Sequence, residues 1–157
     1  DPVQYAAVAE FNTVQAAIDF WDDPEYAAAR GLMGSKDDES AVVDRRVCCI
    51  EGEPLKIAPG QGFWLNHVHE IVDETAFFSY AEASMSNFTS TSFGMVVHQH
   101  AGKQKIQLAA ALGFESINKA IGIYHTAEYG VALVAGGMEE KEDEVVKRTI
   151  CAVEVPK

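Results

Sequence analysis

The sequence predicts an α+β protein that holds one and a half copies of a β-α-β-β-α-β unit. Residues 11–51 align without a gap with residues 114–154, and about thirteen of about forty aligned positions are identical. Residues 62–105 lie between the copies and have no counterpart earlier in the chain. A period of roughly 100 residues is too long for a solenoid repeat, so each copy is a domain. We therefore expect the second half of one unit at residues 1–56 and a whole unit at residues 57–157.

The half-unit is predicted to be a strand, a helix in two parts and a closing strand. Residues 5–11 are mostly apolar, as in a strand, and Thr13 follows them as a helix cap. Apolar residues then recur at helical spacing through residues 14–21. Asp23, followed by a proline, caps a second helix, so the helix is broken and restarted. Residues 41–51 are predicted to form the closing strand.

The whole unit is predicted by the same signals. Its elements are a strand at 62–72, a helix capped by Asp73, a strand at 93–100, a strand at 106–114, a broken helix with caps at Ser116 and Thr126, and a strand at 144–155. This order is that of the ferredoxin-like fold, whose four strands lie in the sheet order 4-1-3-2.

Composition excludes several classes of partner. The net charge is −12, with twelve basic residues against twenty-four acidic ones, which argues against nucleic acid and against an anionic membrane surface. No apolar run approaches the roughly 20 residues of a membrane helix, and no signal peptide opens the chain. The three cysteines, Cys48, Cys49 and Cys151, form no disulfide framework. We expect a soluble, cytoplasmic protein.

The half-unit predicts a partner. It holds only the third and fourth strands of its sheet, and in the 4-1-3-2 order these two strands flank the missing first strand. Without that strand, both would expose unpaired backbone groups. We expect a separate chain or peptide to supply the missing β-α-β half. Because Asp1 is not a natural start, the upstream part of a cleaved precursor is one source, and exchange with a second copy of this chain is the alternative.

Several motifs of the chain resemble a known family. They are Gly62-Phe63-Trp64-Leu65-Asn66-His67-Val68, the Phe-x-Ser-x-x-x-Ala segment at 114–120, Trp21 or Tyr124 before a Glu-Tyr pair, and the Val-Glu or Ile-Glu-Gly endings. They are similar to the DUF1330 family of the dimeric α/β-barrel superfamily. The resemblance spans nearly the whole chain and implies two ferredoxin-like sheets paired into a dimeric α/β-barrel, here within one polypeptide.

The resemblance implies architecture more strongly than chemistry. The family tends to carry an arginine near the end of the second helix, where this chain has Met33 and Gly136. The Arg-Gly-Gly that usually ends the second strand of the family is His100-Ala101-Gly102 here.

Two His-x-His pairs are the chemical signal of the sequence. His67 and His69 lie on one predicted strand, and His98 and His100 lie on another. Residues two apart on a strand share a face and are roughly 6.6 Å apart, a spacing from which two imidazoles can bind one divalent metal such as Zn, Cu or Ni. The two predicted strands are separated by a third, so one pair with a carboxylate or water is an easier site than all four histidines.

The face of the sheet decides which residues join this site. Trp64 and Val68 suit the face that packs on helices, which assigns His67 and His69 to the opposite, barrel-lining face. The residues predicted to contact a ligand are His67, His69, His98, His100, Phe63 and Leu65. Three roles stay open for the histidines: metal ligands, contacts to an organic ligand, or polar barrel-lining side chains bonded to water and backbone.

The leading hypothesis for function is a protein that binds a small apolar or aromatic molecule, such as a pigment, in a barrel pocket, with or without a metal. The alternative is a cofactor-free cyclase, isomerase or monooxygenase that uses a barrel histidine as general base. A purely structural assembly protein is a third interpretation. Convergent ligands would favour the metal site, whereas a single histidine beside a pocket would favour the base.

Overall fold

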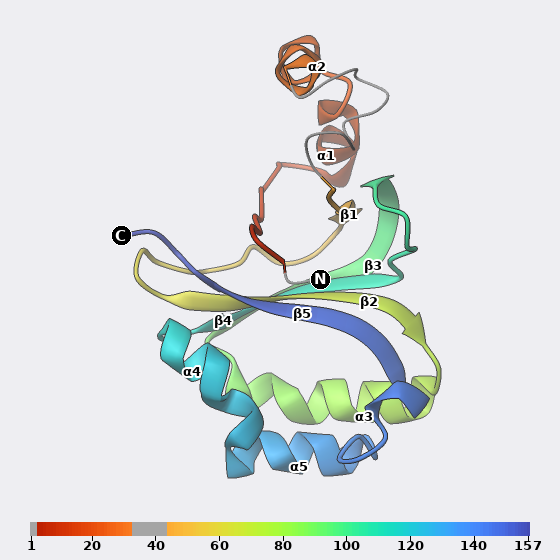
Figure 1. Ribbon diagram of the computed structural model, residues 1–157, viewed down its shortest axis with the longest axis vertical. Coiled ribbons are helices and arrows are strands. Elements are labelled where there is room, and N and C mark those ends of the chain that lie inside the picture. The colour runs from red at the N-terminus through yellow and green to blue at the C-terminus, as the bar shows by residue number, and fades with distance from the viewer. Residues whose placement is uncertain (1–2, 33–43) are drawn as a thin grey trace.

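The computed structural model describes residues 3–32 and 44–157, and its described part is an α+β fold with a five-stranded sheet (Figure 1). Its elements are α1 (Val14–Phe20), α2 (Pro24–Gly31), β1 (Val47–Ile50), β2 (Gly62–Ile71), α3 (Glu74–Ser84), β3 (Ser90–Ala101), β4 (Leu108–Phe114), α4 (Ile117–Gly122), α5 (Ala127–Ala135) and β5 (Val146–Glu154).

The sheet is antiparallel throughout, in the order β1-β3-β4-β2-β5. Its last four strands, read from β5, are the fourth, first, third and second strands of the whole unit. The predicted order 4-1-3-2 is therefore confirmed, and this unit is ferredoxin-like.

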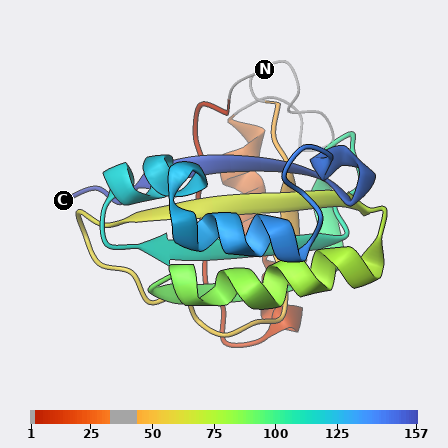
Figure 2. The same ribbon diagram turned by 90° about the horizontal axis from the view of Figure 1, so that it is seen from below.

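Three helices cover one face of the sheet, here called the helix face (Figure 2). α3 and α5 pack on each other, and α4 packs on β2, β4 and β5. Between them and the sheet lies the hydrophobic core, which includes Trp64, Val68, Phe77, Leu112, Phe114, Ile123, Tyr129 and Val146. No helix in the described residues is long and apolar enough to cross a membrane.

The predicted helix caps are confirmed. The side chains of Thr13, Asp73, Ser116 and Thr126 each accept a hydrogen bond from the backbone N–H three residues further on. Asp23 accepts from the backbone N–H groups of Glu25 and Tyr26. These caps satisfy N–H groups that the first turn leaves without a helical partner, which explains why each broken helix restarts where it does.

The half-unit differs from its prediction in one strand. Residues 5–11 form no strand, and none of the described strands pairs with them. The equivalent residues of the second copy, 108–114, pair with both β2 and β3. The closing strand forms only as β1, which pairs with the far end of β3, so that Cys49 lies opposite His98. Residues 41–43 of the predicted strand, and Met33, lie outside the described residues. Figure 1 shows β1, α1 and α2 across the sheet from α3.

Candidate functional site

Strand β2 presents different chemistry on its two faces. Trp64 and Val68 point into the core on the helix face. His67 and His69 lie on the other side of the strand, here called the opposite face, as the sequence predicts, and each is only 8% exposed. In the ladder, His67 stands between Ala109 of β4 and Thr149 of β5. The small Ala109 adds little bulk beside the imidazole.

Arg46 joins His69 and Thr149 in a closed triangle of hydrogen bonds. Its Nη1 lies 3.1 Å from His69 Nε2 and 3.1 Å from Thr149 Oγ1, and Thr149 Oγ1 lies 2.9 Å from His69 Nε2. His69 Nδ1 lies 3.1 Å from the carbonyl oxygen of Lys105. A carbonyl can only accept, so Nδ1 donates its proton there, and Nε2 accepts from Arg46. His69 is therefore neutral.

His67 is also neutral at pH 7. Burial, with contributions from Arg46 and His69, lowers the pKa of His67 from 6.5 to about 4. A neutral imidazole carries one ring nitrogen that donates and one that accepts. The opposite face thus places one permanent cation, Arg46, beside two uncharged histidines.

The second histidine pair lies against the half-unit. His98 is exposed, and the rings of His98 and His100 are 4.5 Å apart between centroids. The ring of His100 stacks on Trp21, at the end of α1, with a centroid distance of 4.7 Å and an interplanar angle of 6°. Burial lowers the pKa of His100. One face of the His100 ring is therefore covered by Trp21, and this contact packs the end of α1 against β3.

The four histidines do not gather around one point. Within residues 3–32 and 44–157, no three His, Cys, Asp or Glu side chains stand close enough to share a metal ion. The two pairs form separate environments, one with Arg46 and one with Trp21.

The two predicted apolar ligand residues, Phe63 and Leu65, share the strand with His67. Phe63 lines a hollow of about 290 Å³ together with Val8, Leu55, Ile57 and Val153. Leu65 is half-buried and lies between Ala111 and Cys151 in the ladder. An apolar wall therefore continues along the strand from the histidines.

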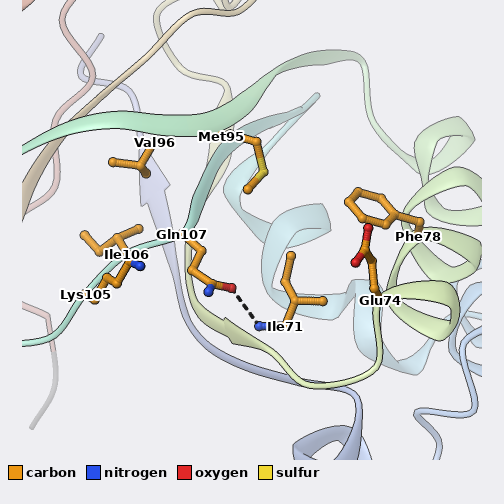
Figure 3. A pocket seen from close by; sticks show the side chains of 8 residues that line it. All are labelled: Ile71, Glu74, Phe78, Met95, Val96, Lys105, Ile106 and Gln107. Carbon is orange, nitrogen blue, oxygen red and sulfur yellow. Dashed lines mark hydrogen bonds between the residues drawn. The ribbon is translucent and has the colours of Figure 1, made fainter.

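A larger hollow, of about 650 Å³, lies elsewhere. It is lined by Ile71, Glu74, Phe78, Met95, Val96, Lys105, Ile106 and Gln107 (Figure 3). Phe78 and Glu74 project from α3 towards Met95 and Ile71, and Gln107 Oε1 accepts a hydrogen bond from the backbone N–H of Ile71. None of the predicted site residues lines this hollow.

A buried polar network crosses the helix face. Arg148 donates to the hydroxyls of Tyr80 (2.9 Å) and Tyr124 (3.0 Å) and to Glu142 Oε1 (2.9 Å). The hydroxyl of Tyr129 hydrogen-bonds that of Tyr80. Burial and the neighbouring Tyr80 raise the pKa of Tyr129. Because every hydroxyl is used within the protein, this network is structural.

Sequence reasoning missed Arg46. Its equivalent in the second copy is Thr149, so the repeat gave no signal. The Arg148 network did carry a signal, since Arg148 and Tyr129 repeat Arg45 and Tyr26, and the Nη1 of Arg45 lies 3.3 Å from the hydroxyl of Tyr26.

Comparison with known proteins places the chain in no family. No protein-family model matches it, and no curated protein matches it. Among solved structures it is similar to a dimeric ferredoxin-like protein of unknown function from Thermobifida fusca, at 12% sequence identity and a TM-score of 0.43. That similarity covers 66% of this chain and all of the other.

Proposed function

We propose that the chain binds a small molecule on the opposite face of its sheet, and that the molecule has an apolar, flat body and an anionic or carbonyl oxygen. In this proposal the sheet belongs to a dimeric α/β-barrel of the DUF1330 kind, made of one and a half ferredoxin-like repeats, with the opposite face as its interior. A pigment is one ligand of this chemical description.

The charge of Arg46 carries the proposal. The guanidinium is partly buried, and the hydrogen bonds that it makes go to a neutral histidine and a threonine. It forms an ion pair with none of the carboxylates in the described part of the chain. A partly buried cation without an opposite charge is costly, and an anionic oxygen of a ligand would offset that cost.

The neighbours of Arg46 supply the rest of the site. The neutral ring of His67 offers one N–H donor to a ligand oxygen. Leu65 and Phe63 supply an apolar surface for the ligand body along the same strand. Small-molecule sites commonly combine an apolar wall with a few polar groups of this kind.

The alternative function, a cofactor-free cyclase, isomerase or monooxygenase, has weaker support. A general base works best when its pKa is near the operating pH. With a pKa of about 4, His67 is a weak base at pH 7, and both ring nitrogens of His69 are engaged by hydrogen bonds. Binding therefore accounts for the geometry better than proton abstraction.

Metal binding stays a prediction of the histidine pattern. The adjacent rings of His98 and His100 support it, since two imidazoles at this spacing can bind one Zn, Cu or Ni ion. Further ligands would come from water or from the bound molecule.

A pair of fluorescent probes tests the role of Arg46. Anilinonaphthalene sulfonate is an aromatic anion, and phenylnaphthylamine is the same ring system without the sulfonate. We expect the protein to bind the anion more tightly, and Arg46→Met to weaken anion binding by roughly tenfold or more, as loss of a charged hydrogen bond does. Binding of the neutral probe should stay within about twofold, because its apolar contacts are unchanged.

Lys119→Met is the matched control. It removes one positive charge from an exposed position on α4, where Lys119 pairs with Glu115. This variant should bind both probes as the parent chain does. Equal weakening of anion binding by the two variants would show that only net charge matters, and would contradict the site.

A further inference from the structure

The half-unit repeats the local structure of the whole unit but not its surroundings. α1, α2 and β1 correspond to α4, α5 and the end of β5, each 103 residues further on. Thr13 caps α1 as Ser116 caps α4. The second copy therefore shows what normally packs around such a half-unit.

Equivalent apolar residues are buried in one copy and exposed in the other. Phe114 is 3% exposed, whereas its equivalent Phe11 is 39% exposed. Ile123 is 5% exposed, whereas Phe20 is 41% exposed. In the second copy, Trp64 of β2 packs on Phe114 at 5.4 Å between ring centroids. The covering elements are β2 and α3, and they have no equivalent in the half-unit.

Two strand edges show the same asymmetry. β1 and β5 are the edge strands of the sheet, so each has one side that pairs with no strand of the described chain. β4, the third strand of the whole unit, is held between β2 and β3. The equivalent residues 5–11 pair with neither kind of strand and stay irregular. Three segments therefore have an edge at which a further strand could pair: β1, residues 5–11 and β5.

We propose that this surface binds a further polypeptide segment, in addition to residues 1–157, with the β-α-β structure of residues 62–101. Its first strand would lie between β1 and residues 5–11, as β2 lies between β5 and β4. Because Leu65 lies opposite Cys151, the segment's residue at that position lies opposite Cys48. Its helix would pack on α2 as α3 packs on α5.

The second strand of the segment would close the sheet. The first part of β3 pairs with β4 and its last part pairs with β1. By the same geometry, the segment's second strand would pair with residues 5–11 and then with β5. The result is a closed barrel of about eight strands, a size that can hold one small ligand. The inference extends the barrel of the proposed function, but the surface exists whether or not a ligand binds.

A second copy of this chain does not fit as the donor. Its own residues 62–101 already form part of its sheet and core, since Trp64, Val68 and Phe77 are buried there. Releasing them would expose that core and break the ladders of β2 with β4 and β5. A segment that is free of its own sheet is the occupant that costs least.

A tandem fusion tests the proposal. An extra copy of residues 57–103 is joined directly before Asp1, which reproduces the 103-residue spacing of the repeat. In the added copy, Leu65→Cys should form a disulfide with Cys48 under mild oxidation, because directly opposite strand residues lie within bonding reach. Asn66→Cys in the added copy is the control, because position 66 faces the helices and should give no disulfide with Cys48.

Hydrogen exchange gives a second readout on the same fusion. We expect the amides of residues 5–11 to exchange on the order of 100-fold more slowly than in the parent chain, because they enter a strand ladder. Replacing Trp64 and Val68 by Asp in the added copy should abolish this protection.

Unchanged exchange at residues 5–11, or equal disulfide yields from the two cysteine positions, would overturn the proposal. So would a dimer of the parent chain with protected residues 5–11, which would identify a second copy as the donor. Binding of anilinonaphthalene sulfonate is measured in a separate experiment. A negative result there would contradict the proposed ligand site without contradicting the binding of the β-α-β segment.

Discussion

Two arginines, Arg148 and Arg46, differ in the groups that surround their positive charge. Arg148 is almost fully buried on the helix face, where tyrosine hydroxyls and Glu142 accept its hydrogen bonds. Arg46 is partly buried on the opposite face, where its partners are His69 and Thr149. The first charge is balanced inside the protein. The second forms no ion pair with a carboxylate of the described residues.

Arg148→Met should destabilise the fold by about 3–5 kcal/mol, as removal of one partner of a buried ion pair does. The loss leaves the hydroxyls of Tyr80 and Tyr129 with fewer partners inside the core. Urea unfolding measures the change. Lys147→Met is the control on the same strand, because the Lys147–Glu70 ion pair is exposed and should cost about 0–1 kcal/mol. Similar losses in both variants would mean that burial of Arg148 contributes nothing.

His67 predicts a pH-dependent stability. The unfolded chain takes up a proton near pH 6.5, whereas the folded protein keeps His67 neutral until about pH 4. Its contribution is therefore complete above pH 6.5 and is lost as pH falls towards 4, by about 1–3 kcal/mol. His67→Gln should remove this part of the slope when unfolding free energy is measured from pH 4 to 8. An identical slope in both proteins would show that His67 titrates normally when folded.

At the scale of elements, the sequence predicted those features that depend on interactions between residues close together in the chain. The capping residues Asp73, Ser116 and Thr126 act on backbone groups three residues away, so the pattern alone located the helix starts. Residues 5–11 have the apolar pattern of a strand, yet a strand needs neighbours to pair with. Their irregular structure could not be read from the segment itself, because it depends on pairing, and none of the described strands lies beside them.

The contact between α3 and α5 depends on one glycine. A Cβ at Gly136 would lie 2.5 Å from the Cβ of Tyr80, so Gly136→Ala should destabilise the fold by about 1–3 kcal/mol through overpacking. Gly130→Ala, inside α5, meets nothing within 4 Å and should stabilise the protein by about 0.5–1 kcal/mol through helix propensity. Thermal unfolding of the two variants measures both changes. If both variants shifted the melting temperature in the same direction, α5 would pack less closely on α3 than described.

For the whole molecule, sequence reasoning placed His67 and His69 on the correct face of the sheet but did not find the residues that surround the histidines. Alternation along β2 put His67 and His69 opposite Trp64, which the structure bears out. The sequence could not show that His100 stacks on Trp21 or that Arg46 reaches His69. Both contacts join the half-unit to the whole unit, so they follow from how β1 docks on β3 rather than from any local pattern.

The two edge strands also determine how the chain would associate if nothing covered them. β1 and β5 lie at opposite ends of one sheet and present different sequences, so a contact between the β1 of one molecule and the β5 of the next is head-to-tail. A contact of that type repeats without closing unless its rotation happens to form a ring. If the rotation does not close a ring, the uncovered protein would grow into open-ended filaments at high concentration, and covering either edge would cap their growth.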